Sequence, residues 1–243
     1  MLATYQWWQR FRTVTGHRSS KFLPYLVGNY PTLFYPLNTL YKGKETKRAV
    51  RHDTEITIEG FPRSGNSFAV YAFKFGQQRP VAVAHHMHVP AQVIQSVRFG
   101  IPVCVLIRQP EEAIRSMVLK YPGIPLPFAL LGYALFYETC MRYQGHFVAA
   151  RFEQVVTDFG AVIDRINAKF ATQFTRFEHT PPNVERVFAF LDRKADKAVG
   201  GRLYGSFRPH PAKEKAKREI MLTAYPALFS RCRQIYRRFN ALT

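Results

Sequence analysis

The sequence predicts an α/β fold: a single three-layer domain with a central, mostly parallel sheet flanked by helices. Short apolar segments with strand character alternate with longer helical segments, as parallel sheets with right-handed crossovers require. Residues 101–107 (IPVCVLI) form an unbroken apolar run, which is typical of a strand covered on both faces. Hydrophobic residues make up 47% of the 243 positions, which is enough for one full core and excludes global disorder.

The first predicted strand leads into a loop suited to an anion. Residues 54–59 alternate, with Ile56 and Ile58 on one face. Residues 60–67 are mostly small or turn-forming, and residues 68–75 read as an apolar helix. Backbone N–H groups at a helix N-terminus lack intrahelical partners and lie at the positive end of the helix dipole, so this arrangement can hold a phosphate or sulfate.

The spacing in this loop resembles the phosphate-binding pattern G-x-x-x-x-G-K-[ST]. Gly60, Gly65 and Ser67 occupy matching positions, but Asn66 stands where the pattern has lysine. Because that lysine reaches the β- and γ-phosphates of a triphosphate, its absence argues against triphosphate chemistry. The loop is therefore expected to hold a smaller anion, with Arg63 as its cation.

The remaining elements follow from runs of apolar residues between turn signals. Gly100 is placed to end a helix, and Pro110 to begin one with acidic residues in its first turn. Strands are predicted at 80–84, 101–107 and 147–152, and helices at 91–99, from Pro110, at 125–143, 159–170, 183–193 and 212–239, the last with a kink at Pro226. No internal repeat is evident.

A second anion site is predicted where the 101–107 strand ends. Arg108 lies at the carboxyl end of this strand, the edge at which open α/β sheets bind ligands. Ser116 follows eight residues later in the next helix. An arginine fork and a hydroxyl together can hold one phosphate.

Histidines cluster between the two predicted anion sites. His85, His86 and His88 follow the 80–84 strand. Imidazole has a pKa suited to removing a proton near neutrality, so His88 and His86 are candidate general bases. His86 and His88 could also bind a metal, but a third ligand is not apparent, so we expect no metal.

These motifs resemble those of sulfotransferases that use 3′-phosphoadenosine 5′-phosphosulfate (PAPS). Residues 62–68 (PRSGNSF) are similar to the family's 5′-phosphosulfate loop, and Arg108 to Ser116 to its 3′-phosphate motif, with Gln109 replacing the usual asparagine. Residues 88–90 (HVP) resemble H-[LV]-P, where the histidine is the base. The resemblance implies a P-loop-like domain, PAPS as co-substrate without a metal, and a hydroxyl-bearing acceptor.

The resemblance also implies roles for individual residues. His88, or His86 in its place, would remove the acceptor proton, and Arg63 would stabilise the leaving phosphate. Phe152 matches an aromatic residue on the adenine side. The expected cofactor contacts are Arg63, Ser64, Gly65, Asn66, Ser67, Phe68, Arg108, Ser116 and Phe152, with Arg202 and Arg208 as candidates in a loosely matching glycine-rich loop. Phe68 replaces a frequent tryptophan that stacks on adenine.

Positive charge is concentrated at the two ends of the chain. Of the net charge of +19, residues 1–53 carry +7 (9 Lys/Arg, 2 Asp/Glu), residues 54–192 carry +2 (13, 11) and residues 193–243 carry +10 (13, 3). We therefore expect a basic, aromatic N-terminal arm (1–53), packed on or beside a sulfotransferase-like domain (54–243). Such charge favours anionic partners, among them acidic glycans and lipids.

The expected location is the cytoplasm. The three cysteines are sparse and widely spaced, which is typical of a reducing compartment. Residues 1–20 lack the apolar segment of a signal peptide, and prolines interrupt the apolar residues 22–41. Peripheral membrane contact through the basic ends stays open.

Two other functions stay open beside the sulfotransferase. One is an ATP-dependent P-loop phosphotransferase, against which Asn66 argues. The other is a non-catalytic basic protein that binds nucleic acid or membranes; it explains the charged ends but not the grouping of Arg63, His88 and Arg108. Nucleic acid is the less favoured partner, and the acceptor is expected among glycans, lipids and small metabolites.

Overall fold

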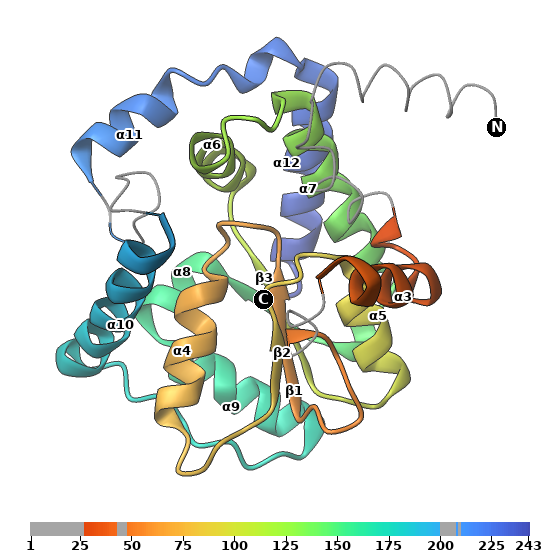
Figure 1. Cartoon of the computed structure of the whole chain (residues 1–243), viewed down its shortest axis with the longest axis vertical. Coiled ribbons are helices and arrows are strands. Elements are labelled where there is room, and N and C mark those ends of the chain that lie inside the picture. Colours follow the sequence, from red (N-terminus) through yellow and green to blue (C-terminus); the bar gives the residue numbers. More distant parts are fainter. Residues whose placement is uncertain (1–26, 43–47, 200–207, 209) are drawn as a thin grey trace.

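The structure is a computed structural model that describes residues 27–42, 48–199, 208 and 210–243. Its centre is a four-stranded parallel sheet in the order β2-β1-β3-β4 (Figure 1). The strands are β1 (Ile56–Gly60), β2 (Val83–His85), β3 (Val103–Ile107) and β4 (Val148–Arg151). The sheet confirms the predicted α/β fold, and each strand overlaps a predicted segment.

Helices cover both faces of the sheet and complete three layers (Figure 1). One face packs against α4 (Asn66–Gly76), α9 (Phe159–Phe170) and α10 (Pro181–Val199). The other packs against α5 (Pro90–Arg98), α6 (Pro110–Lys120), α7 (Leu126–Met141) and α12 (Pro226–Asn240). Strand β3 is buried on both sides, since Cys104 faces the first apolar cluster and Val105 the second. This explains its unbroken apolar sequence.

The strand register brings the carboxyl ends of the strands together at one edge. Ile58 pairs with His85, Gly60 with Leu106, and Ile107 with Arg151. The segments that follow these ends are the loop before α4, the histidine segment before α5, the turn into α6, and α8 (Phe152–Thr157), which begins directly after β4. The motifs predicted after these four strands therefore meet at the edge where parallel sheets bind ligands.

Two regions differ from the prediction. Helix α3 (Pro31–Lys42) forms although Pro36 lies inside it, and it packs Phe34 against Val89 and Ala91 beside α5. A proline within a helix removes one backbone hydrogen bond, and this apolar packing offsets that cost.

Of the described helices, none combines the length and apolar character needed to cross a membrane.

The C-terminal region forms two helices rather than one kinked helix. Helix α11 (Pro211–Arg218) and α12 are separated by the 3-10 turn η5 (Leu222–Ala224); a similar turn, η3 (Gln144–His146), precedes β4. Pro226 lies in the first turn of α12, where its missing N–H costs no intrahelical bond. The break allows α11 to pack against α6 while α12 packs against α7.

Candidate active site at the carboxyl edge of the sheet

The loop between β1 and α4 has the shape of an anion cradle. Gly65, the residue before α4, has φ of 91°, and Arg63 also adopts a left-handed conformation with φ of 69°. A side chain at Gly60 is excluded, since its Cβ would lie 2.5 Å from the carbonyl oxygen of Leu106. Both glycines are thus required by the backbone, Gly65 for its conformation and Gly60 for the close approach of β3.

Two buried polar side chains of the loop, Ser64 and Asn66, hold its conformation through hydrogen bonds to the core. The hydroxyl of Ser64 is buried 3.3 Å from the Tyr137 hydroxyl, and Asn66 donates from Nδ2 to the carbonyl of Phe61 at 3.0 Å. Ser64 was expected to contact the cofactor, but its backbone N–H also bonds within the loop, to Phe61 at 3.2 Å. In this structure Ser64 therefore supports the loop from the core side rather than facing a ligand.

Arg63, Ser116 and Arg108 lie in direct contact. Arg63 donates from Nε to the Ser116 hydroxyl at 2.8 Å, and Arg108 donates from Nη1 to the Arg63 carbonyl at 3.3 Å. Burial lowers the pKa of Arg63 to about 10, so its guanidinium stays charged at neutral pH. The two predicted anion sites are thus adjacent, at the carboxyl edge of the sheet.

Arg108 is fixed by further contacts. Its guanidinium carbon lies 4.0 Å from the centre of the Phe152 ring, a cation–π geometry, and Nη2 donates to Glu112 at 3.2 Å. Phe152 begins α8 and also lies against Gly65, where an added Cβ would meet the ring at 3.2 Å. Phe152 therefore links the loop before α4 to Arg108.

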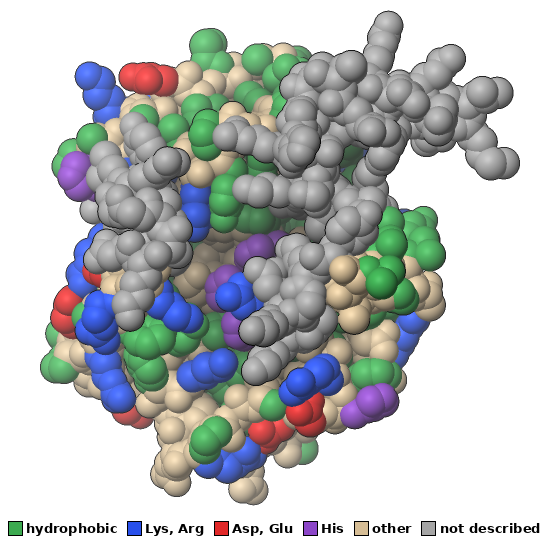
Figure 2. All heavy atoms as spheres, in the orientation of Figure 1, with side chains coloured by type: hydrophobic (Ala, Val, Ile, Leu, Met, Phe, Trp, Pro, Cys, Tyr) green, Lys and Arg blue, Asp and Glu red, His purple; other side chains and the backbone are tan. Residues whose placement is uncertain are grey.

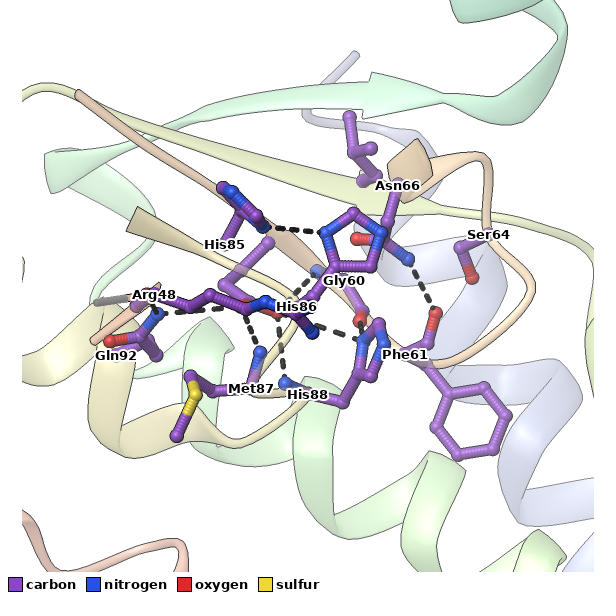
Figure 3. A network of polar contacts seen from close by, with 12 residues as sticks. Arg48, Gly60, Phe61, Ser64, Asn66, His85, His86, Met87, His88 and Gln92 are labelled. Carbon is purple, nitrogen blue, oxygen red and sulfur yellow. Dashed lines mark hydrogen bonds and ion pairs between the residues drawn. The ribbon is translucent and has the colours of Figure 1, made fainter. Parts of the chain in front are cut away.

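The histidine segment contains two residues with strained backbones. His86 and His88 have φ of 58° and 57°, a conformation that residues other than glycine rarely adopt. His88 places Nδ1 2.8 Å from the Gly60 carbonyl oxygen (Figure 3). Because a carbonyl can only accept, Nδ1 must carry the proton, and in the neutral ring Nε2 is the basic nitrogen.

His86 makes contacts through both ring nitrogens. Nδ1 lies 2.7 Å from Nδ1 of His85, and Nε2 lies 2.9 Å from the Ser67 hydroxyl. Burial lowers the pKa of His85 to about 3 and that of His86 well below its usual value, with nearby Arg48 and Lys194 acting in the same direction. Both rings are therefore neutral near pH 7.

Glu59 is a buried carboxylate that the sequence reasoning did not single out. One oxygen accepts from the N–H of Met87 at 2.7 Å and the other from the N–H of His88 at 3.1 Å. Its side chain is fully buried. Burial raises its pKa to about 7, against the opposing effect of these hydrogen bonds. In the sequence, the alternation of residues 54–59 predicts only that Glu59 faces away from Ile56 and Ile58.

A cavity opens at the carboxyl edge of the sheet, lined by the loop before α4, the histidine segment and α6. Figure 2 shows histidine side chains at the centre of this face, with lysine and arginine side chains near them. Among the described residues, its charged lining consists of one carboxylate, Glu214, and six cations: Arg63, Arg108, Lys120, Arg208, Lys213 and Lys217. Its other polar and aromatic lining includes Asn66, Ser67, Phe68, His86, His88, Ser116, Tyr121, Phe152 and Phe188.

Helix α11 contributes two of these cations, both outside the predicted site. Lys213 is 5% exposed and Lys217 is 4% exposed. Lys217 donates to Glu112 at 2.8 Å, so Glu112 joins it to Arg108, and burial lowers the pKa of Lys213 to about 8. In sequence the lysine-rich α11 resembles a solvated helix, and only its packing against α6 reveals the burial.

Two residues predicted to contact the cofactor, Phe68 and Arg208, line the cavity and also make contacts with other side chains. Phe68 lines the cavity but is buried against Phe188 and His179, with ring centres 5.4 and 5.7 Å away. Arg208 lines it too, but pairs with Glu185 at 2.6 Å and Asp192 at 2.7 Å, so much of its charge is neutralised. Arg202 lies outside the described residues.

Among the described residues, no group of three or more His, Cys, Asp or Glu side chains is arranged to hold a metal ion. The histidine cluster uses its nitrogens in contacts with each other, with Ser67 and with Gly60.

Comparisons with known proteins give one structural similarity. No family model matches the sequence, and no curated protein matches it significantly. A solved structure, mouse sulfotransferase SULT7A1 complexed with PAP, aligns over 82% of this chain and 90% of its own, with 11% identity and a TM-score of 0.42. Because so low a TM-score supports no inference about activity, the proposal below rests on the geometry of the site.

Proposed function

We propose that this protein is a sulfotransferase that moves the sulfuryl group of PAPS to a hydroxyl-bearing acceptor. The observation that carries the proposal is the meeting of Arg63, Ser116 and Arg108 in the wall of one cavity that also contains the His88 ring. The residues that would bind the two anions and the histidine that would accept the proton therefore line the same cavity, as this transfer requires.

The charge of the cavity supports a ligand with several negative charges. Six cations line the cavity; Arg208 pairs with Glu185 and Asp192, and Arg108 and Lys217 share Glu112. The positive charge that remains would balance a nucleotide with phosphates at both ends. The loop before α4 would hold the 5′-phosphosulfate through its backbone and Arg63. Arg108 and Ser116, with Lys213 and Lys217 of α11, would hold the 3′-phosphate.

The apolar part of the cavity supports a base between these two anions. Phe152, Val156, Phe188 and Leu191 line it, from α8 and α10. Aromatic and aliphatic walls of this kind can hold a purine by stacking and burial. Phe152 would then act on both parts of the nucleotide, because it also supports Arg108.

His88 would act as the base. Its Nε2 takes the proton of the acceptor hydroxyl as the acceptor oxygen forms a bond to sulfur. The bond from sulfur to the bridging oxygen breaks, and its electron pair stays on the 5′-phosphate of PAP. Arg63 stabilises this developing charge. His86 is less suited to the role, since both its nitrogens already contact His85 and Ser67.

An ATP-dependent transfer is the less favoured function. Asn66, at the position of the phosphate-binding lysine, has its amide committed to the Phe61 carbonyl. Glu59, the carboxylate at the end of β1, is buried and bonded to the backbone of Met87 and His88, so it is not placed to hold Mg²⁺.

The acceptor would be a glycan, a lipid or a small metabolite, and the net charge of +19 favours one that is itself anionic. We also propose that the basic ends of the chain contact acidic membrane surfaces, which binding to vesicles with and without phosphatidylserine would test.

The proposal is tested by following ³⁵S from labelled PAPS into a fractionated extract, with PAP binding measured by calorimetry. We expect label transfer by the parent and none by His88→Asn with PAP affinity kept. The exposed Arg142→Ala variant, outside the cavity, is the control and should match the parent. If PAP does not bind the parent, the proposal is wrong; if PAP binds but no label moves, the site is a nucleotide-binding site without transferase activity.

A further inference from the structure

The end of β1 contains a carboxylate whose contacts go beyond holding the fold. Glu59 accepts from two successive backbone N–H groups, those of Met87 and His88, at 2.7 and 3.1 Å. It accepts more weakly from the N–H of Gly60 at 3.3 Å and from Gln92 at 3.5 Å. The two short contacts fix the segment in which His86 and His88 adopt left-handed conformations.

The same carboxylate lies close to the His88 ring. Its Oε2 is 3.7 Å from Nδ1, while Nδ1 donates to the Gly60 carbonyl at 2.8 Å. The Gly60 carbonyl therefore helps to orient the ring, and a buried carboxyl group lies beside it. The His88 side chain keeps 24% exposure and lines the cavity, so it can meet a ligand, whereas Glu59 has no exposure.

We infer that Glu59 is a positioning residue for His88: it fixes the backbone of the proposed base and stabilises the imidazolium formed when His88 takes the acceptor proton. The inference rests on the proposed function above. An opposite charge within 4 to 6 Å favours the charged form of a titrating group, and more strongly where water is excluded.

Other titratable groups face this pair and bear on its pH dependence. Tyr35 of α3 and Tyr137 and Cys140 of α7 interact with Glu59, and burial raises the pKa of all three, so they stay neutral. Around His88, the His86 ring lies 5.6 Å away, with His85 beyond it. Arg48 and Lys194 add positive charge near His85 and His86, which opposes protonation there.

The test is an NMR titration of the His88 ring in the presence of saturating PAP, assigned by loss of its signal in His88→Asn. Glu59 is ionised above pH 7, so at these pH values Glu59→Gln should lower the protonated fraction of His88, and with it the pKa of His88. PAP affinity by calorimetry should change less than about twofold, since Glu59 does not line the cavity. An unchanged pKa of His88 in a variant that still binds PAP would overturn the inference.

A second readout distinguishes positioning from a merely structural role. Transfer of ³⁵S from labelled PAPS into the fractionated extract should fall strongly in Glu59→Gln when His88 is present, and should fall little further when the substitution is made in His88→Asn. Additive losses would contradict the inference. If Glu59→Gln does not fold, Glu59→Asp takes its place, since the shorter side chain moves the carboxylate away from the His88 ring; an unchanged pKa of His88 in that variant would overturn the inference. Failure of the parent to bind PAP would instead overturn the proposed function.

Discussion

Arg63 donates from Nε to the hydroxyl of Ser116 at 2.8 Å, although the two residues lie 53 positions apart in the sequence. This bond joins the loop after β1 to the second half of α6. It makes the two anion sites one continuous wall, to which Arg108 adds a bond to the Arg63 carbonyl. A ligand that occupies one site must therefore approach the other.

Replacement of Arg63 should affect turnover more than binding. Arg63→Ala removes the cation placed beside the leaving phosphate, so PAPS turnover should fall by about 100- to 1,000-fold, as when a transition-state donor is lost. PAP affinity should fall less, about tenfold, because Arg108 and the loop N–H groups stay in place. Steady-state kinetics and calorimetry test this, with Arg142→Ala as control. Equal losses in turnover and affinity would show that Arg63 only binds.

Phe152 should affect nucleotide affinity through Arg108. Phe152→Ala removes the ring 4.0 Å beneath the guanidinium, so PAP affinity should fall by about 5- to 30-fold, the range of a partly desolvated cation–π contact. Phe152→Leu is the matched variant, which keeps apolar bulk and loses the ring face. If both variants bind PAP like the parent, Arg108 does not depend on Phe152.

Gly65 should be more sensitive to substitution than a glycine with open space around it. Gly65→Ala combines a φ of 91° with a Cβ 3.2 Å from the Phe152 ring, and should lower the free energy of unfolding by about 1 to 3 kcal/mol. Gly145→Ala is the control, since nothing lies within 4 Å of its added Cβ. Urea unfolding gives both values. Similar values for the two variants would contradict the geometry of the loop.

The buried carboxylate of Glu59 should make stability depend on pH. Its folded pKa of about 7 lies above the usual 4.5, so the folded state holds a proton that the unfolded state has lost between these values. The stability from neutral burial is fully present below pH 4.5 and is lost as pH rises through 7. Because Gln does not ionise, the stability of Glu59→Gln relative to the parent should rise by about 3 kcal/mol from pH 4.5 to 8.

The control for this titration is Glu55→Gln. The pKa of Glu55 is lowered, chiefly by its hydrogen bond to Arg79, so its stabilisation is present at neutral pH and lost as pH falls. The stability of Glu55→Gln relative to the parent should therefore change in the opposite direction. Urea unfolding at pH 5 and 8 measures the change for Glu59→Gln, and unfolding at pH values below 4.5 measures the change for Glu55→Gln. A flat difference for Glu59→Gln would mean that Glu59 does not have a raised pKa.

Local pattern predicted much of this fold. The alternation around Ile56 and Ile58, the apolar run ending at Ile107 and the proline at 110 each located an element correctly, since they report on neighbours along the chain. The same signals placed Arg63, His88 and Arg108 after parallel strands, whose carboxyl ends meet at one edge. Their meeting in one cavity therefore followed from strand direction.

What the sequence left hidden depends on packing between distant segments. Lys213 and Lys217 lie in a helix that reads as solvated, and they are buried only because α11 packs against α6. The direction of the Ser64 hydroxyl depends on Tyr137, 73 positions away. Glu59 follows the alternation of its strand, which indicates only the face on which it lies. Its hydrogen-bond partners, the N–H groups of Met87 and His88, follow the next strand along the chain.

The central claim is that one cavity binds both ends of a 3′-phosphorylated adenine nucleotide. Its most direct test is calorimetry of PAP and 5′-AMP on the parent and on Arg108→Ala. We predict that the parent binds PAP about 100-fold more tightly than 5′-AMP, and that Arg108→Ala loses at least about tenfold of this preference. Equal affinity of the parent for PAP and 5′-AMP, or tighter binding of Mg²⁺-ATP than of PAP, would contradict the account.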